Sequence, residues 1–282
     1  MVTYNPDSAL EQNIRALLPQ VDKLIVVDNG SEPDNRERIQ AIALACGFDI
    51  LWNEENLGIA GGLNAGIRRA FANADYAWIA TFDHDSRVSP GFRDIMLQAW
   101  SSCPFRDQVA LIGPYQVLFP ENPEVRALRG PWSPLFVERP VMLQSGSLLS
   151  TESLRCVGLL DESFFIDYVD FEFCLRLRKH GLRIIEATNA ALVHRVGAPT
   201  SHSVLKHTCV VFNHSPVRRY YAARNRLRVY RRYLLSDPRW IAHDAWSWFK
   251  EVIKLLLFEQ DRWQKLKSMA KGAWDAVCGA PA

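Results

Sequence analysis

The sequence lacks the patterns of several common protein classes. Six cysteines are scattered over 282 residues, and none belongs to a C-x-x-C pair. No metal-binding cysteine motif or disulfide framework is therefore indicated, and a reducing cytoplasm is the expected location. No stretch reaches the about 18 consecutive apolar residues of a membrane-spanning helix. The first residues, MVTYNPDSAL, have no basic segment followed by a long apolar run, so we expect no secretory signal.

Neither sign of charge is in large excess, since the formal net charge is +2 at pH 7. Global charge therefore gives no argument for a nucleic-acid partner. Arginine is dense between positions 218 and 232, whereas the acidic residues lie mostly earlier in the chain. This basic segment favours an anionic partner surface, either phosphates or lipid headgroups.

Signatures of other α/β nucleotide-binding enzymes are also missing. No G-x-G-x-x-G follows the first strand-like run, which argues against a nicotinamide-dependent dehydrogenase. The glycine-rich segment 56–66 has no P-loop lysine, and the glycine-rich, basic N-terminal signature of sugar-phosphate nucleotidyltransferases is absent. A non-catalytic module that binds a nucleotide-sugar or a glycan stays open as an alternative to an enzyme.

What is present in the first half is an alternation of apolar runs and helix-like segments. We expect strands at 23–31, 48–56, 76–86 and 109–114, and helices at 35–47, 58–74 and 89–103. Ser89 and Pro90 have the residue types of an N-cap and a first helical position. The order predicts an α/β fold with a mostly parallel, doubly wound sheet and helices on both faces.

The second half predicts a different organisation. Residues 161–181 are aromatic and acidic and then become a helix that ends at Gly181, and 182–197 predict a strand pair or a strand and loop. Residues 215–235 and 237–274 predict helices. We expect one domain over 1–214, divided near residue 114, followed by a helical region over 215–282.

Two acids follow the apolar run in WIATFDHDSR. Asp83 and Asp85 can reach one small cation, and their hard oxygens suit Mg²⁺ or Mn²⁺. The alternative is an ordinary turn, where Asp residues accept hydrogen bonds from backbone amides. Asp28 also falls at the end of a predicted strand, and ligands of parallel sheets bind at that edge, which favours the metal interpretation.

Two further segments have a functional and a structural interpretation each. The glycines of NLGIAGGLNAG (56–66) can let backbone amides approach a phosphate, or they can form a packing turn. In DYVDFEF (167–173), a carboxylate among aromatic residues can be a general base, or the acids can belong to the first turn of a helix. The residues alone leave both pairs of interpretations open.

The ordered stretches VTYNP, VVDNGS, NLGIAGGLNAG, FDHDS, DESFFIDYVDFEFCLRLRKHG and VHRVG resemble the family 2 inverting glycosyltransferases with the GT-A fold. The resemblance covers residues 1 to roughly 230 and is strongest to bacterial rhamnosyltransferases that use dTDP-L-rhamnose, with galactofuranosyltransferases as relatives. It implies transfer of a sugar onto a hydroxyl of a cell-surface glycan, such as O-antigen, or of a lipid-linked acceptor. L-rhamnose is the sugar that the resemblance favours. A galactofuranosyl or other hexosyl transfer from a UDP-sugar is the alternative.

The resemblance implies a mixed, mostly parallel sheet in a catalytic domain over 1–214, with a nucleotide-sugar half at about 1–114 and an acceptor half at about 115–214. It also implies roles for matching residues. The nucleotide-sugar would contact Thr3, Tyr4, Asn5, Asp28, Asn29, Asn56, Gly58, Asn64 and Asp83. Asp83, Asp85 and His194 would hold Mg²⁺ or Mn²⁺, and Asp170 would be the catalytic base. Relatives often have Glu where Val169 stands, so Asp170 is the choice for the base and Asp167 the fallback.

Two regions depart from that pattern or extend it. Fewer apolar residues precede VTYNP than in relatives, so we expect a shortened first strand. Arg224 and Asn225 in RRYYAARN would contact donor or acceptor, or else belong to an arginine-rich helix surface. The last helices are rich in Trp and Lys, as in Trp246, Trp248, Lys250 and Lys254. They would lie on the inner face of the cell membrane, or pack on the catalytic domain or a second subunit. A homo-oligomer stays open.

Overall fold

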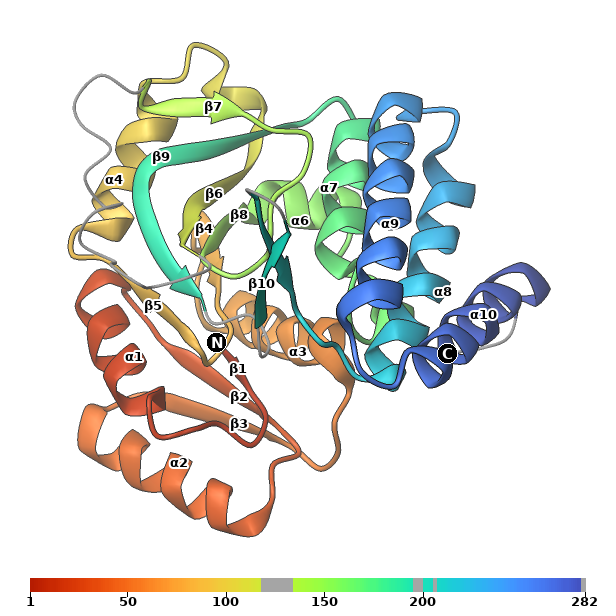
Figure 1. Cartoon of the computed structure of the whole chain (residues 1–282). Helices are drawn as coiled ribbons and strands as arrows, with labels where there is room; N and C mark the ends of the chain where they lie inside the picture. Colours follow the sequence, from red (N-terminus) through yellow and green to blue (C-terminus); the bar gives the residue numbers. More distant parts are fainter. Residues whose placement is uncertain (118–133, 195–199, 205–206, 280–282) are drawn as a thin grey trace. The chain divides into compact units, whose positions relative to one another are not determined.

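The computed structural model describes residues 1–117, 134–194, 200–204 and 207–279, and for 194, 200–204 and 207–210 it describes the backbone only. The chain forms two compact units (Figure 1). Unit 1 comprises Met1–Glu162 and Val169–Arg195, and unit 2 comprises Ser163–Tyr168 and Val196–Ala282.

Unit 1 begins with a parallel sheet in the order β1-β2-β3. Its strands are β1 (Val2–Thr3), β2 (Ile25–Asn29) and β3 (Asp49–Asn53), connected through the helices α1 (Leu10–Leu17), α2 (Pro33–Cys46) and α3 (Gly58–Asn73). The predicted strands and helices of this region are confirmed. Pro33 suits the first turn of α2, where its missing N–H has no intrahelical partner.

The second sheet of unit 1 is mixed. Its order is β4-β8-β6-β9-β5, with β7 paired to β9. The strands are β4 (Trp78–Thr81), β5 (Ser86–Val88), β6 (Val109–Val117), β7 (Phe136–Glu138), β8 (Ser147–Ser150) and β9 (Arg183–His194). Only β6 and β9 are parallel among its described pairs, so the parallel part of the predicted mixed, mostly parallel arrangement is found mainly in the first half of the unit.

The helices of this second half are α4 (Phe92–Ser101), α6 (Thr151–Val157) and α7 (Val169–Lys179), with short 3₁₀ turns at Leu18–Gln20, Arg106–Gln108 and Glu162–Phe164. The prediction that Ser89 and Pro90 begin α4 is wrong. Gly91, with a φ of 69°, is the N-cap, because the Phe92 amide first closes a turn onto the Ser89 carbonyl at 3.3 Å. The expected strand at 76–86 is likewise divided into β4 and β5 by the turn that holds the two aspartates.

One apolar core joins the two sheets of unit 1. Ile14, Val26, Ile39, Met96 and Ile112 have no exposed surface and belong to the same cluster of packed side chains. Each such side chain contributes about 1.5–3 kcal/mol to the free energy of folding when it is fully buried. The strand ends that carry Asp28 and Asp83 therefore rest on a rigid base.

Unit 2 consists of a hairpin, β10 (Thr200–Val204) and β11 (His207–Val211), and the helices α8 (Pro216–Tyr233), α9 (Pro238–Phe258) and α10 (Arg262–Cys278). The Ser215 hydroxyl accepts a hydrogen bond from the Arg218 amide and caps α8, as expected of a Ser-Pro start. Ala223, Leu255 and Met269 form a small core between the helices. Among the described residues, no helix has both the length and the apolar character needed to cross a membrane.

Candidate active site

The short strand β1 lies between the two groups of predicted acids. Val2 pairs with Val27 of β2 on one side and forms a parallel bridge with Asp83 on the other. Thr3 pairs with Asp28. Because adjacent strands are about 4.8 Å apart, Asp28 and Asp83 are held about two strand spacings apart at the carboxyl ends of β2 and β4. The structure thus brings together acids that are more than fifty residues apart in the sequence.

Asp28 is fully buried yet keeps one oxygen without a hydrogen bond. Its Oδ2 accepts from the Ser31 amide and from Nε of Arg36, both at 3.1 Å. Its Oδ1 and the neighbouring Thr3 hydroxyl have no hydrogen-bond partner among the described residues. Buried polar atoms without partners are rare and costly, so this pair can receive polar groups of a ligand. An N–H donor such as the imide of a pyrimidine base fits an acceptor of this kind.

Tyr4 and Asn5 follow β1 and differ in their surroundings. The Tyr4 side chain is exposed. Asn5 adopts a left-handed backbone conformation, with a φ of 43°. Its Oδ1 accepts from the Glu32 amide at 2.9 Å, and its own amide donates to the Ser31 hydroxyl at 2.8 Å. Asn5 thereby ties the end of β1 to the loop after β2, and Tyr4 is left accessible to a planar ligand group.

Asn29 and Asn56 organise the start of α3. The Asn29 amide nitrogen donates to Oδ1 of Asn56 at 3.0 Å and to the Gly58 carbonyl at 2.9 Å. The Asn29 oxygen accepts from Asn53 at 3.0 Å and from the Leu57 amide at 3.2 Å. These bonds shape the loop predicted to line the nucleotide-sugar, and direct contacts of Asn29, Asn56 and Gly58 with a donor remain predictions.

Asn64 is predicted to line the nucleotide-sugar as well, and both its side-chain nitrogen and its side-chain oxygen form hydrogen bonds within the protein. Its nitrogen donates to the Leu160 carbonyl and to Glu162, each at 2.8 Å, and its oxygen accepts from the Leu160 amide at 3.1 Å. The hydrogen bond from Asn64 contributes most to the lowered pKa of Glu162, which also accepts from Arg68. Asn64 thus joins α3 to the segment before α7, and its contact with a donor stays a prediction.

The glycines of α3 allow the helix to lie close to the sheet. A Cβ on Gly62 would be 2.9 Å from Cγ1 of Val2, nearer than real Cβ contacts come. One on Gly66 would be 3.1 Å from Cγ2 of Val27. Of the two interpretations given for this segment, close packing explains both residues directly.

Asp83 is held by the small-residue segment QSGSLLS at 144–150. Nε2 of Gln144 donates to Oδ1 of Asp83 at 2.5 Å. The Asp83 amide donates to the Ser145 hydroxyl at 3.0 Å, and that hydroxyl lies 2.7 Å from the Ser86 hydroxyl. Gly146 closes the turn with a φ of 80° and donates its amide to the Thr81 carbonyl at 2.7 Å. Sequence reasoning missed Gln144 and Ser145, for which QSGSLLS was the only signal.

Asp170 stands in the first turn of α7 and lines a small cavity together with Gln144, Thr81 and Phe173. The residue that bonds Asp83 therefore also adjoins the predicted base. One oxygen of Asp170 accepts from the Phe171 amide at 2.9 Å. The position places this carboxylate on a cavity that Gln144, the partner of Asp83, also lines.

Asp167, the fallback base, has a structural partner within unit 2. Its two oxygens accept hydrogen bonds from Nε and Nη2 of Arg218 at 2.9–3.1 Å. This pair commits the Asp167 carboxylate to a structural contact. Asp170 as the base, with Asp167 as the fallback, stays a prediction.

The predicted metal ligands are partly described. Asp83 and Asp85 lie in the turn between β4 and β5, and the register places the His194 backbone opposite Ser86, next to Asp85. The His194 side chain lies outside the described residues. Among the side chains that are described, no cluster of three or more His, Cys, Asp or Glu could hold a metal ion. The two carboxylates supply hard oxygen donors, which fit Mg²⁺ or Mn²⁺.

Arg224 and Asn225 are committed to contacts inside unit 2. Arg224 is almost fully buried and donates to the Ser163 carbonyl at 2.8 Å. The Asn225 amide nitrogen donates to the carbonyls of Phe164, Ile166 and Asp167 at 2.7–3.0 Å. Both side chains therefore fix the loop that precedes α7, a role that the sequence did not suggest.

Comparison with known proteins identifies the family. The profile described as Glycosyl transferase family 2 matches residues 1–126. The dTDP-rhamnosyl transferase RfbF of Shigella flexneri is 30% identical over 243 residues, which cover 80% of this chain and 76% of the relative. The chain belongs to glycosyltransferase family 2. The family predicted from the sequence is thereby confirmed.

Two other family comparisons extend over nearly the whole chain. Galactofuranosyltransferase GlfT1 of Mycolicibacterium smegmatis is 25% identical over 300 residues, covering 96% of this chain and 95% of the relative. Mannosyltransferase PcManGT from Pyrobaculum calidifontis, solved in complex with GDP-Man and Mn²⁺, superposes with a TM-score of 0.58 at 17% identity. That match covers 100% of this chain and 74% of the other, and it confirms the GT-A fold of this glycosyltransferase.

Proposed function

We propose that this glycosyltransferase moves L-rhamnose from dTDP-L-rhamnose onto a hydroxyl of a bacterial cell-surface glycan or of its lipid-linked precursor. The supporting observation is the arrangement of Asp28, Asp83 and Asp170 around β1 and Gln144, in a chain 30% identical to a dTDP-rhamnosyl transferase. The domain boundary near residue 214 and a homo-oligomer remain parts of this proposal.

The donor's base is the ligand of the buried polar pair on β1 and β2. Asp28 Oδ1 accepts the imide N–H of thymine, which satisfies an atom that otherwise lacks a hydrogen bond. Thr3 offers its hydroxyl beside it, and the exposed Tyr4 ring offers a face for stacking. The carboxylates of Asp83 and Asp85, with His194 as the further ligand, would hold Mg²⁺ or Mn²⁺. When bound, that cation would offset the negative charge on the leaving diphosphate.

The chain's own residues account for the transfer as one displacement. Asp170 takes the proton of the acceptor hydroxyl, which becomes a better nucleophile. The oxygen forms a bond to the anomeric carbon while the bond from that carbon to the diphosphate oxygen breaks. Attack opposite the leaving group inverts the anomeric configuration. Gln144 donates its amide N–H to Asp83 and lines a small cavity together with Asp170, so this side chain orders Asp83 beside the proposed base.

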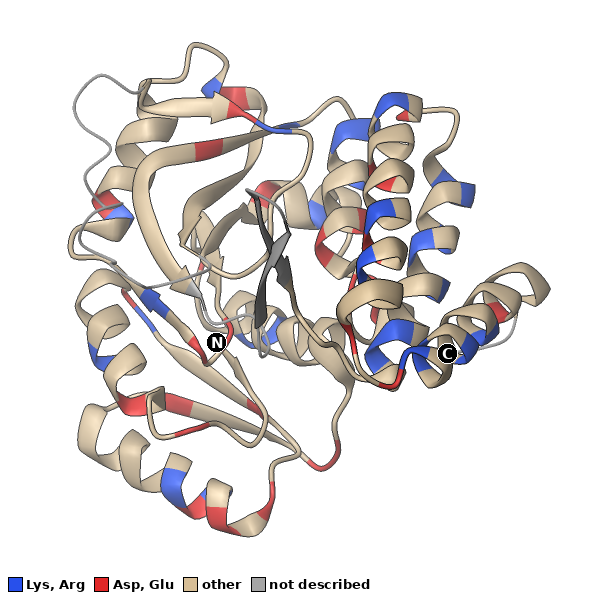
Figure 2. Cartoon of the chain, in the orientation of Figure 1, with Lys and Arg blue, Asp and Glu red and all other residues tan. Residues whose placement is uncertain are grey.

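The helices of unit 2 suit a lipid-linked acceptor. Trp246, Phe249, Ile253 and Leu257 are exposed on α9 at the spacing of one helix face. The rings of Trp246 and Phe249 stack with centroids 5.5 Å apart. Lysine and arginine side chains are frequent on α8, α9 and α10 (Figure 2). Exposed aromatic residues flanked by cations favour binding at the interface of an anionic bilayer. We place the enzyme in the cytoplasm, peripherally bound to the inner face of the cell membrane.

The donor is tested by thermal unfolding with Mn²⁺ and each of dTDP, UDP and GDP. We expect dTDP to raise the Tm most, because a ligand that binds only the folded state stabilises it. The Asp28→Asn variant should lose most of that shift, whereas Asp34→Asn on the same unit should keep it. A larger shift with UDP would favour the galactofuranosyl alternative, which the similarity to GlfT1 over 96% of the chain supports. No shift with any nucleotide would contradict the proposed donor site.

The membrane proposal has its own test. Flotation with vesicles that contain anionic lipid should retain the wild type and lose a variant with Trp246, Phe249 and Ile253 changed to Ser. Lys267→Gln serves as the control, since it changes one residue of α10 and leaves the exposed apolar face of α9 intact. Equal flotation of the triple variant and the wild type would contradict the proposal.

A further inference from the structure

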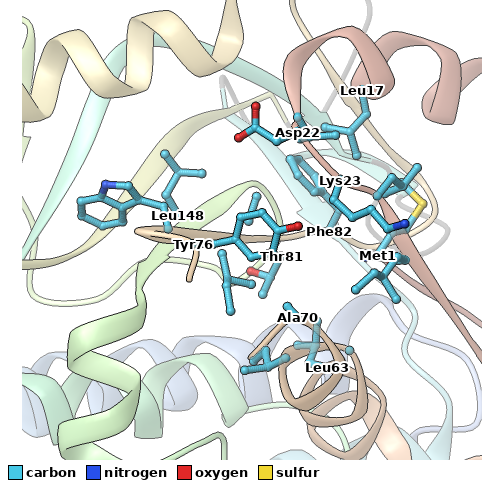
Figure 3. A pocket seen from close by; sticks show the side chains of 18 of the residues that line it. Met1, Leu17, Asp22, Lys23, Leu63, Ala70, Tyr76, Thr81, Phe82 and Leu148 are labelled. Carbon is cyan, nitrogen blue, oxygen red and sulfur yellow. Dashed lines mark hydrogen bonds between the residues drawn. The ribbon is translucent and has the colours of Figure 1, made fainter. Parts of the chain in front are cut away.

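The carboxylate proposed to bind the donor's base lies on the face of the first sheet opposite α3. Val2 pairs with Val27, and Thr3 pairs with Asp28. Val2 and Val27 line an apolar cavity of about 250 Å³, with Leu63 of α3 on one side of it (Figure 3). Successive side chains of a strand point to opposite faces, so Thr3 and Asp28 point away from this cavity, and neither is among the described residues that line it. The proposed site for the base is therefore separate from the cavity.

Arg36 of α2 connects Asp28 to the neighbouring strand. Its Nε donates to Oδ2 of Asp28 at 3.1 Å, and its Nη2 donates to the carbonyl of Asn53 at the end of β3. The guanidinium carbon lies 5.5 Å from the centroid of the Trp52 ring, so a cation–π contact also holds the group. Asp28 is fully buried, whereas the Arg36 side chain is partly exposed. One planar side chain thus spans the ends of β2 and β3.

This bridge fixes the direction of the second oxygen of Asp28. Oδ2 accepts two hydrogen bonds, from Arg36 and from the Ser31 amide, each at 3.1 Å. Rotation of the carboxylate would break both bonds, so Oδ1 is held in one direction. Oδ1 and the hydroxyl of the paired Thr3 are buried and have no hydrogen-bond partner among the described residues. Because an ionised carboxylate only accepts hydrogen bonds, Oδ1 selects a ligand group that carries an N–H or an O–H.

We propose that Arg36 is a positioning residue that makes the donor site selective for pyrimidine bases with an imide N–H. Thymine and uracil present that N–H at N3. Cytosine presents a lone pair there, which would face the lone pairs of Oδ1 in a buried site. Arg36 acts through Asp28 and does not itself contact the base, and Trp52 and Asn53 keep its guanidinium in place. The inference rests on the proposed function in one respect, namely that Asp28 binds the donor's base.

The selectivity is measured as a ratio of Kd values, by calorimetric titration with Mn²⁺, for dCDP against dTDP and for CDP against UDP. The wild type should prefer the imide-bearing nucleotide about 100-fold or more, since the other base leaves a buried acceptor unpaired. Arg36→Gln should reduce the ratio to about tenfold or less, mostly through weaker binding of dTDP. Trp52→Leu keeps the charge of Arg36 and should reduce the ratio about threefold. Arg36→Lys should give an intermediate ratio, because a compact ammonium cannot span Asp28 and Asn53.

Arg139→Gln is the matched control for loss of an arginine from a buried ion pair. Arg139 donates through Nε to Glu186 of the second sheet at 2.6 Å, and the Glu186 side chain is also buried. This variant should lower the Tm and leave the ratio of Kd values unchanged. The ratio therefore separates positioning of Asp28 from a general loss of stability.

Four results would overturn the proposal. An unchanged ratio in Arg36→Gln and Trp52→Leu, when the wild type discriminates, would overturn the role of Arg36 and leave the proposed function intact. An equal loss of affinity for all four nucleotides would do the same, since a purely structural role predicts that result. A wild type that binds cytosine and imide nucleotides equally would show that Asp28 does not select the group at N3. A wild type that binds none of them would overturn the proposed function, and this inference with it. If Arg36→Gln does not fold, Trp52→Leu and Arg36→Lys provide the same test, and an unchanged ratio in both would overturn the role equally.

Discussion

Replacing Asp170 by Asn should abolish most of the transfer while the donor still binds. The substitution keeps the size of the side chain and removes the group that accepts the proton. Loss of a positioned general base lowers a rate by about 10²–10⁴-fold, which corresponds to about 3–5 kcal/mol in the activation free energy. The donor contacts proposed for Asp28 and Asp83 lie on other elements, so the Kd for dTDP with Mn²⁺ should stay within about twofold.

Asp167 provides a matched control only three residues away. Its carboxylate is bonded to Arg218 at 2.9–3.1 Å, and both side chains are partly exposed. A charged hydrogen-bonded pair of this kind contributes about 1–2 kcal/mol to the free energy of unfolding. Asp167→Asn should therefore lower the Tm by about 2–6 °C and kcat by less than tenfold. Arg218→Gln should show the same stability loss, and the double variant should lose less than the sum.

The assay measures dTDP released from dTDP-L-rhamnose, with water or with a panel of glycan acceptors. Thermal unfolding of the same samples separates loss of the base from loss of folded protein. Transfer by Asp170→Asn within about threefold of the wild type would refute the assignment of the base. A catalytic loss in Asp167→Asn as large as that of Asp170→Asn, at an unchanged Tm, would transfer the role to Asp167.

Three further predictions concern one residue of unit 1 and two of unit 2. Burial, followed by the charge of Arg218, lowers the pKa of His214 to about 4. As the pH drops from 6.5 to 4, the unfolded chain binds a proton at His214 before the folded chain does, so the free energy of unfolding should fall. The pKa difference alone corresponds to about 3 kcal/mol, and partial exposure of the side chain reduces the expected loss to about 2 kcal/mol. His214→Gln should flatten that slope in urea unfolding at several pH values, and an unchanged slope would contradict it. Gln144→Met removes the donor to Asp83 and should lower kcat/KM about tenfold with a Tm loss of a few degrees at most; unchanged kinetics would show that the bond is dispensable. Asn225→Ala leaves three loop carbonyls without their donor and should lower the free energy of unfolding in urea by about 2–3 kcal/mol. A loss below about 0.5 kcal/mol would contradict the role of Asn225 in holding the loop.

Much of the fold could be predicted because its local signals agree with its packing. The alternation of apolar runs and helices around Val26, Ile39 and Ile67 gave the parallel first half of unit 1. The individual strands of the mixed second sheet were not all placed, because strands such as Ser147–Ser150 are short and become strands only by pairing with β4 and β6. The start of α4 was misplaced because Ser89 and Pro90 are residue types that often begin helices. In the structure they form a turn instead, and Gly91 is the N-cap.

The acids of the candidate site were proposed from the order of their motifs along the chain, and the residues that hold them could not be. Asp28, Asp83 and Asp170 each have an ordinary structural interpretation as well, since turns and the first turns of helices also accommodate carboxylates. Gln144 carries no such signal, since its function arises from a 2.5 Å bond to Asp83 across 61 residues. Asn225 is similar, because an amide in an arginine-rich helix does not show which carbonyls it will meet. Polar residues that act through long-range hydrogen bonds are therefore where sequence reasoning is weakest.

The two-residue strand β1 sets the geometry of the proposed chemistry. Val2 is paired on both sides, and Thr3 is paired with Asp28, so the separation of the proposed base-binding acid from the proposed metal acid is set by this strand. A strand this short is held by few hydrogen bonds, among them the bond from the Val2 amide to the Phe82 carbonyl at 2.9 Å. A donor that engages both Asp28 and Asp83 would therefore restrict the motion of Thr3 and Asp28 relative to Asp83.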